Sequence, residues 1–139
     1  MEKLDKPCLL DIPKIHDPRG NLSFIEERKH IPFKIERTYW IYDVPGGEAR
    51  GGHAFRENEE FVVALSGSFD IIVDDGKRKR KFCMSRSYYG LYIPKGLWRT
   101  LENFSTNSLA LEFGSRAYSR ADYIDDYERF LALNGDEEI

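Results

Sequence analysis

Residues 61–84 read FVVALSGSFDIIVDDGKRKRKFCM and divide into three strand-sized runs joined by two turns. Residues 61–65 and 69–73 are rich in β-branched and aromatic side chains, which are common in strands, and they flank a Ser-Gly-Ser turn. Asp75-Gly76 then reverses the chain into the third run, residues 78–84. Because Asp-Gly suits the tight turns that join neighbouring strands, this segment carries the strongest hairpin signal in the chain.

Similar strand-sized runs lie on both sides of this segment, at residues 21–26, 36–44, 88–93 and 108–113. Near the end of the chain the apolar side chains recur with a different period. Residues 120–133 (RADYIDDYERFLAL) place apolar side chains at helical spacing, with Ser119 as the expected N-cap and Asn134-Gly135 as the expected stop. Short strands without interleaved helices predict a closed sheet or a sandwich, with this helix packed outside it.

The bulk properties of the chain limit its partners and its compartment. Its 139 residues suit one domain, over positions 1–139. The net charge of −3 gives no reason to expect nucleic acid, and no apolar run approaches the ~20 residues of a membrane helix. Cys8 and Cys83 are isolated in the sequence, so a reduced, cytoplasmic setting is the expectation.

A histidine-centred segment adds information about the type of barrel. Residues 47–60 read GEARGGHAFRENEE and precede a glycine turn at Gly67. This resembles the first cupin motif: a glycine, a histidine pair two residues apart, a glutamate and a closing glycine. Residues 90–103, with Pro94 and Gly96, resemble the second cupin motif. The resemblance implies an all-β fold, a cupin or double-stranded β-helix (jelly-roll) barrel, with the α-helix at its C-terminus.

The residues at the cupin metal positions argue against a metal. Where metal-binding cupins carry three histidines and a glutamate, this chain carries His53, Phe55, Glu60 and Arg99. Phenylalanine offers no lone pair, and arginine stays protonated and repels a cation. One imidazole and one carboxylate are too few for a tight zinc or iron site. We therefore expect no bound metal and no other cofactor.

His53 itself has two interpretations. It is either a core histidine satisfied by backbone groups or a functional base. Arg50-Gly51-Gly52 favours the second, because the glycines allow close approach and the arginine places a permanent cation near the ring. A nearby cation disfavours imidazolium and keeps the ring neutral, which is the state that a general base requires.

Short segments spread over nearly the full length form a second and more specific pattern. They are Asp17-Pro-Arg-Gly20 with Ile25-Glu26, Ile31-Pro-Phe33, Ile35-Glu-Arg37 with Tyr39, Arg50-Gly-Gly-His53, Leu65-Ser-Gly67-Ser68, Gly90-Leu-Tyr92, Trp98-Arg99, and Tyr118 with Asp122-Tyr-Ile124 and Tyr127. With these segments the chain resembles the thymidine-diphosphate-4-keto-6-deoxyglucose 3,4-ketoisomerases of bacterial surface-polysaccharide synthesis.

This resemblance implies an activity and a partner. The implied enzyme moves a ketone from C4 to C3 of a 4-keto-6-deoxy sugar through an enediol, and its substrate is a nucleotide-diphosphate sugar, a dTDP-sugar. The implied assembly is a cytoplasmic homodimer with exchanged N-terminal strands. Such chemistry needs a neutral base, donors aimed at oxygens that become negative, and a pocket poor in water.

The resemblance also implies roles for individual residues. His53 is the base at the sugar carbon, and Arg50 orients the sugar and stabilises the enediolate. Tyr39 donates to the developing oxyanion or returns the proton, unless it is an aromatic filler of the barrel. Arginine matches phosphate in bidentate fashion. The residues expected to bind substrate are Arg19, Arg37, Phe55, Glu60 and Arg99.

Some of these assignments carry an alternative. A surface salt bridge would explain Arg37 equally well. Phe55 walls the sugar or excludes water, and Glu60 orients an arginine rather than acting as an acid. The family typically has a second histidine where this chain has Phe55. Two other functions therefore stay open: a cupin that holds a nucleotide sugar without turning it over, and a 3,5-epimerase, whose family also carries Arg-Gly-x-His.

Overall fold

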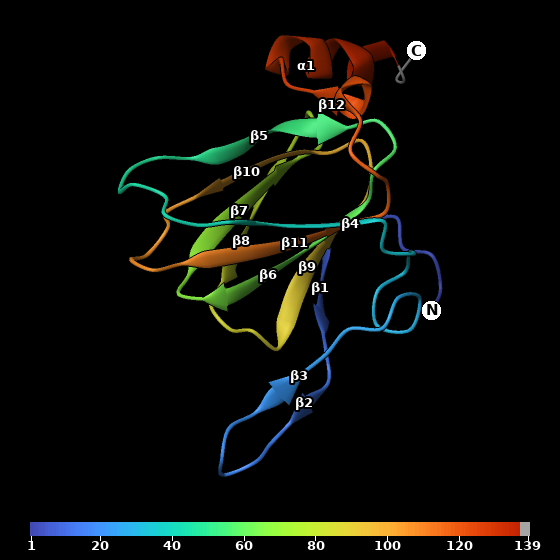
Figure 1. The fold of residues 1–139 in the computed structure, drawn as a ribbon. Coiled ribbons are helices and arrows are strands. Elements are labelled where there is room, and N and C mark those ends of the chain that lie inside the picture. Colours follow the sequence, from blue (N-terminus) through green and yellow to red (C-terminus); the bar gives the residue numbers. More distant parts are fainter. Residues whose placement is uncertain (137–139) are drawn as a thin grey trace.

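The computed structural model describes residues 1–136, a chain of short strands that ends in a helix (Figure 1). The strands are β1 (Cys8–Asp11), β2 (Lys14–Ile15), β3 (Leu22–Ser23), β4 (Arg37–Ile41), β5 (Arg50–Phe55), β6 (Glu60–Ser66), β7 (Phe69–Asp74), β8 (Lys79–Met84), β9 (Tyr89–Ile93), β10 (Trp98–Glu102), β11 (Leu109–Gly114) and β12 (Tyr123–Ile124). A 3-10 helix, Arg120–Asp122, precedes β12, and α1 spans Tyr127–Asp136. Among these residues no helix is long and apolar enough to cross a membrane.

Two antiparallel five-stranded sheets face each other (Figure 1). The first has the order β1-β9-β6-β11-β4 and the second β12-β5-β10-β7-β8, while β2 and β3 form a separate hairpin that projects away from both. In the described part of the chain no strand pair joins the two sheets, so the barrel is a flattened sandwich. The prediction of an all-β jelly-roll fold with a C-terminal helix is confirmed.

Only the second of the two turns in residues 61–84 closes a hairpin. Strands β7 and β8 pair around Asp75-Gly76 as predicted. Strand β6 pairs instead with β9 and β11, so the turn at Gly67 carries the chain from one sheet to the other. Gly67 has φ +66°, and a Cβ there would lie 2.8 Å from the Cα of Ser108, so this crossover requires glycine.

The apolar core lies between the sheets, where β6 and β9 face β7 and β8. Alternate residues of each strand point inward, which is why the same strands carry outward-facing residues between the core positions. The core residues with almost no exposure are Val62, Ala64, Phe69, Ile71, Val73, Met84, Leu91, Ile93, Leu101 and Ala110.

The C-terminal segment differs from the predicted helix over residues 120–133. Tyr123 and Ile124 pair with β5 as strand β12, because a short edge strand satisfies the backbone groups of β5 there. Helix α1 begins only at Tyr127, and its N-cap is Asp126 rather than Ser119: the Asp126 carboxylate accepts hydrogen bonds from the Glu128 and Arg129 amides at 2.9 and 3.3 Å.

Helix α1 continues to Asp136, past the expected stop at Asn134-Gly135. It covers the outer face of the second sheet, where Phe130 and Ile124 bury against Ala54 and Trp98 packs beside them. The other expected strands are present with shifted ends, and residues 21–26 contribute only the two-residue β3. Strands β1, β2, β5 and β10 lie outside the strand-sized runs that were predicted. The expectation of one domain over positions 1–139 stays a prediction, and residues 137–139 lie outside the described residues.

Candidate active site

The polar side chains of the interior gather at the end of the sandwich opposite the apolar core. Tyr39 on β4 and Glu112 on β11 are cross-strand partners in the first sheet. His53 on β5 and Arg99 on β10 are cross-strand partners in the second sheet. Because the two sheets face each other, these four side chains approach one space from opposite walls. We call this space the polar chamber.

A β-bulge in β5 brings Arg50 and His53 to the same side of the sheet. His53 pairs with Arg99 and Arg50 pairs with Leu101, so three steps on β5 match two steps on β10. Gly51, with φ +81°, absorbs the extra residue. Regular alternation would put residues three apart on opposite faces. The bulge is therefore what places both predicted residues toward the chamber, with Arg50 exposed at its rim.

Arg99 and Glu60 form a buried ion pair at the base of the chamber. Nη1 of Arg99 lies 2.6 Å from Oε1 of Glu60, and both side chains are at most 1% exposed. The Arg99 guanidinium also donates to the Leu97 carbonyl at 3.1 Å, which fixes its plane. Glu60 is thus paired with an arginine, and the ion pair links the two sheets through β6 and β10, while its role toward a substrate stays a prediction.

The hydroxyl of Tyr39 donates to the other oxygen of Glu60, Oε2. Burial and the neighbouring Glu60 carboxylate raise the pKa of Tyr39 far above its ordinary value, so the phenol keeps its proton. In this geometry the proton of Tyr39 points at Glu60. Tyr39 therefore positions Glu60, and it would have to leave that carboxylate to serve a substrate oxygen.

His53 is a largely buried neutral imidazole. Burial first, and then the Arg99 and Arg37 guanidinium groups, lower the pKa of His53 to about 3. The expected neutrality is present, but its cause differs from the expectation, since Arg50 is not among the groups that lower this pKa. The ring packs against Phe55 and Tyr123, with centroids 4.7 and 5.0 Å away, and its buried Nε2 has no hydrogen-bond partner.

Arg37 is enclosed by aromatic rings rather than paired with a surface carboxylate. Its guanidinium carbon lies 5.0 Å from the ring centre of Tyr39 and 5.8 Å from those of Phe55 and Tyr123. Its Nη1 donates to the Tyr123 hydroxyl at 3.3 Å, while its buried Nε has no hydrogen-bond partner. An unpaired buried donor is costly, so Arg37 Nε and His53 Nε2 mark where a polar ligand would gain hydrogen bonds.

Phe55 is fully buried and forms an apolar wall of the chamber. It contacts the His53 ring edge to face, and the Arg99 guanidinium carbon lies 5.0 Å from its ring centre. A side chain in this place keeps water from both His53 and Arg99, because it is packed against each of them. The predicted role of Phe55 as a wall beside the sugar stays a prediction.

Glu112 was missed at the level of the sequence. Its side chain is only 3% exposed and lies between the inward-facing Ala110 and Gly114 of the same strand. Burial first, and then the charge of Glu60, raise the pKa of Glu112 well above its ordinary value, which favours the protonated form of this carboxyl. The signal was available: in LALEFG the strand alternation puts one ionisable group on a face otherwise lined by small residues.

Arg19 is the one predicted residue that lies far from the polar chamber. It sits in the turn of the β2–β3 hairpin, its side chain is 90% exposed, and its Nη2 pairs with Asp17 at 2.8 Å. Within one chain the hairpin projects away from the sheets, so Arg19 does not join His53 (Figure 1). The other predicted residues lie in the chamber or at its rim: Arg37, Tyr39, Arg50, His53, Phe55, Glu60 and Arg99.

The donors in the chamber do not form a metal-binding group. Glu60 is already engaged by Arg99 and Tyr39, and Phe55 and Arg99 offer no lone pair for a cation. Across residues 1–136 there is no group of three or more His, Cys, Asp or Glu side chains that could hold a metal ion. The absence of a metal or cofactor stays a prediction.

Together these features define a class: a cupin-type β-sandwich whose interior carries a neutral imidazole, buried carboxyl groups and several guanidinium groups. The family described as WxcM-like, C-terminal matches residues 5–135. A relative from Aneurinibacillus thermoaerophilus, TDP-4-oxo-6-deoxy-alpha-D-glucose-3,4-oxoisomerase, is 38% identical over 122 residues, 88% of each chain. The chain thus belongs to the WxcM-like, C-terminal family.

Solved structures of 3,4-ketoisomerases are also similar to this chain. The TDP-quinovose 3,4-ketoisomerase of Campylobacter jejuni is 40% identical with a TM-score of 0.87, over 93% of this chain and 99% of that one. A sugar 3,4-ketoisomerase of Thermoanaerobacterium thermosaccharolyticum, solved in complex with TDP, is 27% identical with a TM-score of 0.93, over 99% and 100%. A dTDP-4-dehydrorhamnose 3,5-epimerase of Bacillus anthracis, 16% identical with a TM-score of 0.74 over 84% and 76%, shares the fold alone.

Proposed function

We propose that this chain is an isomerase that moves the ketone of a nucleotide-diphosphate 4-keto-6-deoxy sugar from C4 to C3 through an enediol. One observation carries the proposal: a buried, neutral imidazole with a free Nε2 stands among guanidinium groups inside the sandwich. The names of the relatives supply the reaction class, since a curated relative is a 3,4-oxoisomerase and solved structures are 3,4-ketoisomerases. The nucleotide is proposed to be thymidine diphosphate, which one solved neighbour holds.

In the proposed reaction His53 removes the proton from C3 of the sugar through Nε2. A pKa of about 3 makes the imidazole a weak base, because burial and then the charges of Arg99 and Arg37 disfavour its protonated form. An anionic substrate beside these guanidinium groups offsets their charge and raises the pKa of His53 toward the value that a base needs. Substrate binding thereby activates the base.

The guanidinium groups also receive the charge that develops on the sugar oxygens. Arg37 Nε is a donor without a partner, so it can turn to an enediolate oxygen without losing a bond inside the protein. Arg50, at the rim, is proposed to orient the sugar. The rings of Phe55 and Tyr123 limit the entry of water, which strengthens each of these interactions.

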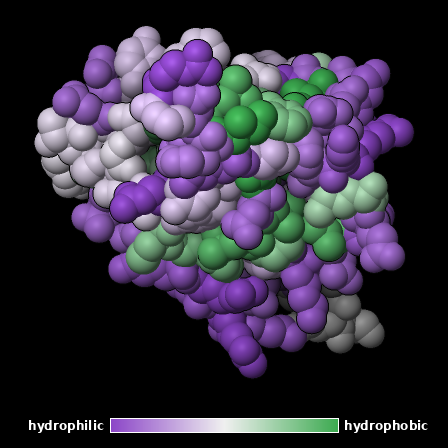
Figure 2. Space-filling view, turned by 90° about the horizontal axis from the view of Figure 1, so that it is seen from below, coloured by the Kyte–Doolittle hydropathy of each residue, from purple (hydrophilic) through white to green (hydrophobic). Residues whose placement is uncertain are grey.

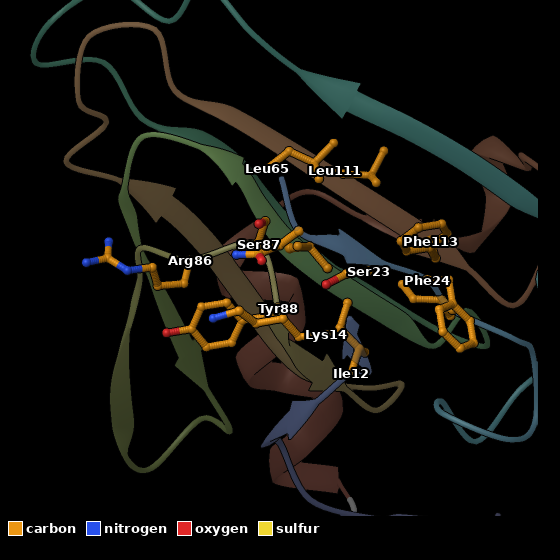
Figure 3. A pocket seen from close by; sticks show the side chains of 13 residues that line it. Ile12, Lys14, Ser23, Phe24, Leu65, Arg86, Ser87, Tyr88, Leu111 and Phe113 are labelled. Carbon is orange, nitrogen blue, oxygen red and sulfur yellow. The ribbon is translucent and has the colours of Figure 1, made fainter. Parts of the chain in front are cut away.

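We further infer that the chain is a homodimer joined through the outer face of the first sheet. Helix α1 covers the second sheet, but part of the first sheet's outer face is bare, and apolar side chains form a band across it (Figure 2). A groove of about 710 Å³ there is lined by Phe24, Leu65, Leu111 and Phe113, among others (Figure 3). Such a patch on a small domain is typical of a protein interface.

The same interface would give Arg19 a role. The β2–β3 hairpin borders this groove through Lys14 and Ser23, and its Ile15 and Leu22 side chains are more than half exposed. A hairpin that gains its packing from a second copy carries Arg19 toward that copy, where a guanidinium suits a diphosphate. We also propose that the protein acts in the synthesis of surface polysaccharides and that it is located in the cytoplasm.

The dimer is tested by light scattering on wild type and on Leu65→Glu. A charge in the groove should convert the dimer to monomer, while Leu133→Glu, at a leucine of similar exposure on α1, should stay dimeric. A monomeric wild type at micromolar concentration would contradict the interface.

The activity is tested by incubating the protein with TDP-4-keto-6-deoxyglucose in deuterated buffer and following the sugar by NMR. We expect a 3-keto product and deuterium at C3 or C4. In His53→Asn both should fall by roughly 10²–10⁴-fold, the usual contribution of a general base, and His30→Asn, at a half-buried histidine outside the chamber, should change neither. Label at C5 would identify an epimerase instead. Tight binding of the nucleotide sugar without any turnover would identify a binding protein.

A further inference from the structure

The starting point is the placement of Glu112 on a central strand of the first sheet. On β11 it is flanked by Tyr39 of β4 and Val62 of β6, and its side chain faces inward. The wall opposite is the second sheet, which carries His53 and Arg99. Facing sheets pack about 10 Å apart, so inward side chains of the two walls lie near each other. A sugar in the chamber would thus have an imidazole on one side and a carboxyl on the other.

The two carboxyls of the chamber, Glu60 and Glu112, have different surroundings. Glu60 takes hydrogen bonds from Arg99 and Tyr39, so its negative charge is well compensated. Glu112 is buried beside that charge, and the more remote cations do not outweigh the two effects. The titratable and charged groups that face it from β4, β6, β5 and β10 are Arg37, Tyr39, Glu60, Arg50, His53 and Arg99.

The proposed isomerisation needs a second proton-carrying group besides the base. As C3 loses its proton the C4 oxygen must gain one, and the C3 oxygen must later lose one. Guanidinium groups hold their protons too tightly for this task, and the hydroxyl of Tyr39 is directed at Glu60. Of the described groups in the chamber, Glu112 is the carboxyl whose pKa is raised well above its ordinary value, by burial first and then by the charge of Glu60.

We propose that Glu112 is a catalytic acid and base of this site, carrying a proton between the two oxygens of the substrate. The inference rests on the proposed function. In the first half, His53 takes the C3 proton while the Glu112 carboxyl protonates the C4 oxygen, giving a neutral enediol, an imidazolium and a carboxylate. In the second half, the Glu112 carboxylate takes the proton of the C3 hydroxyl while the imidazolium protonates C4. The ketone is then at C3, and both residues regain their starting states.

This cycle explains how the chain can work with one imidazole. His53 transfers the proton between carbons and Glu112 transfers the proton between oxygens, so no second histidine is required at Phe55. It also predicts a pH profile with two limbs. Activity requires neutral His53, which sets the acid limb, and protonated Glu112, which sets the alkaline limb.

The test compares Glu112→Gln and Glu112→Asp with wild type over a range of pH, with TDP-4-keto-6-deoxyglucose as substrate. Glu112→Gln should lower kcat by at least about 100-fold, change KM little and remove the alkaline limb. Glu112→Asp keeps an acid and should retain that limb with a smaller loss. Glu102→Gln, the same change at an exposed position of β10, should match wild type.

The outcomes separate the two proposals. If wild type turns over and Glu112→Gln keeps kcat and the alkaline limb, the role of Glu112 is overturned and the proposed function stands. If wild type does not turn over, both fall. Should Glu112→Gln fail to fold, infrared spectroscopy of wild type decides: a protonated-carboxyl band at neutral pH that disappears along the alkaline limb supports the role, and absence of that band overturns it.

Discussion

The two ends of the sandwich interior are built on the same strands but filled with opposite chemistry. Along β10 Leu101 faces the apolar core, and two residues away Arg99 faces the polar chamber. Along β6 Val62 belongs to the core and Glu60 to the chamber. One end gains free energy by removing apolar surface from water, while the other buries charges whose desolvation must be offset by partners. The comparison indicates that the core stabilises a chamber that is costly in itself.

The largest expected effect comes from breaking the ion pair of the chamber. Arg99→Met leaves the Glu60 carboxylate buried without its cation, which should lower the free energy of unfolding by about 3–5 kcal/mol. Urea denaturation measures the change. Lys95→Met, which breaks an exposed pair with Glu57, should cost less than about 1 kcal/mol. Adding Glu60→Gln to Arg99→Met should recover part of the loss; no recovery would show that packing, not charge, dominates at this site.

A cavity in the core should cost nearly as much but leave the chemistry intact. Leu91→Ala removes a fully buried side chain of β9, for which a loss of about 2–5 kcal/mol of stability is typical. Below the unfolding transition, kcat should stay within a few-fold of wild type, because Leu91 lies in the apolar core and not in the chamber. A large fall in kcat of the folded variant would contradict the division into two ends.

Exchanging the wall of the chamber for a second imidazole should be a smaller change. Phe55→His places a polar ring in a fully buried position beside Arg99, at a cost of roughly 1–3 kcal/mol if its nitrogens find no partner. If the Glu112 proton shuttle suffices, kcat should not rise. A tenfold gain in kcat in this variant would instead show that the chain lacks a group that the second histidine supplies.

The effect that is smallest per step of the measurement is a slope in the dependence of stability on pH. Unfolded His53 binds a proton with a pKa near 6.5, whereas burial and the cations Arg99 and Arg37 lower its pKa to about 3 in the folded chain. Between these values the unfolded state holds more protons, so His53 makes stability fall as pH drops from 6.5 toward 3. Wild type minus His53→Phe should show this slope, at most about 1.4 kcal/mol per pH unit. If the stability of wild type and of His53→Phe depended on pH in the same way, His53 would be exposed to water and its burial would be contradicted.

Much of the fold follows from local patterns in the sequence. The Asp75-Gly76 hairpin, the run of short strands and a helix near the C-terminus were predicted, because turn chemistry and side-chain alternation act over a few residues. The structure near the C-terminus was predicted less accurately. The contact of Tyr123 and Ile124 with β5 is made with residues almost 70 positions earlier in the chain, and the helical spacing of 120–133 could not reveal it.

The candidate site divides in the same way. Residue types and spacing were enough to single out most of the site: His53 and Phe55 share a face because they are two apart on a strand, and Arg99 excludes a metal ligand at its position. Glu112 was missed, and which of these residues meet depends on contacts between strands far apart in the chain. Strand register across the sheets brought Glu112 beside Tyr39, a bulge turned Arg50 and His53 to one side, and the projecting hairpin kept Arg19 apart. Ionisation states followed from that assembly, since burial and the charges of distant strands act only once the sheets have packed.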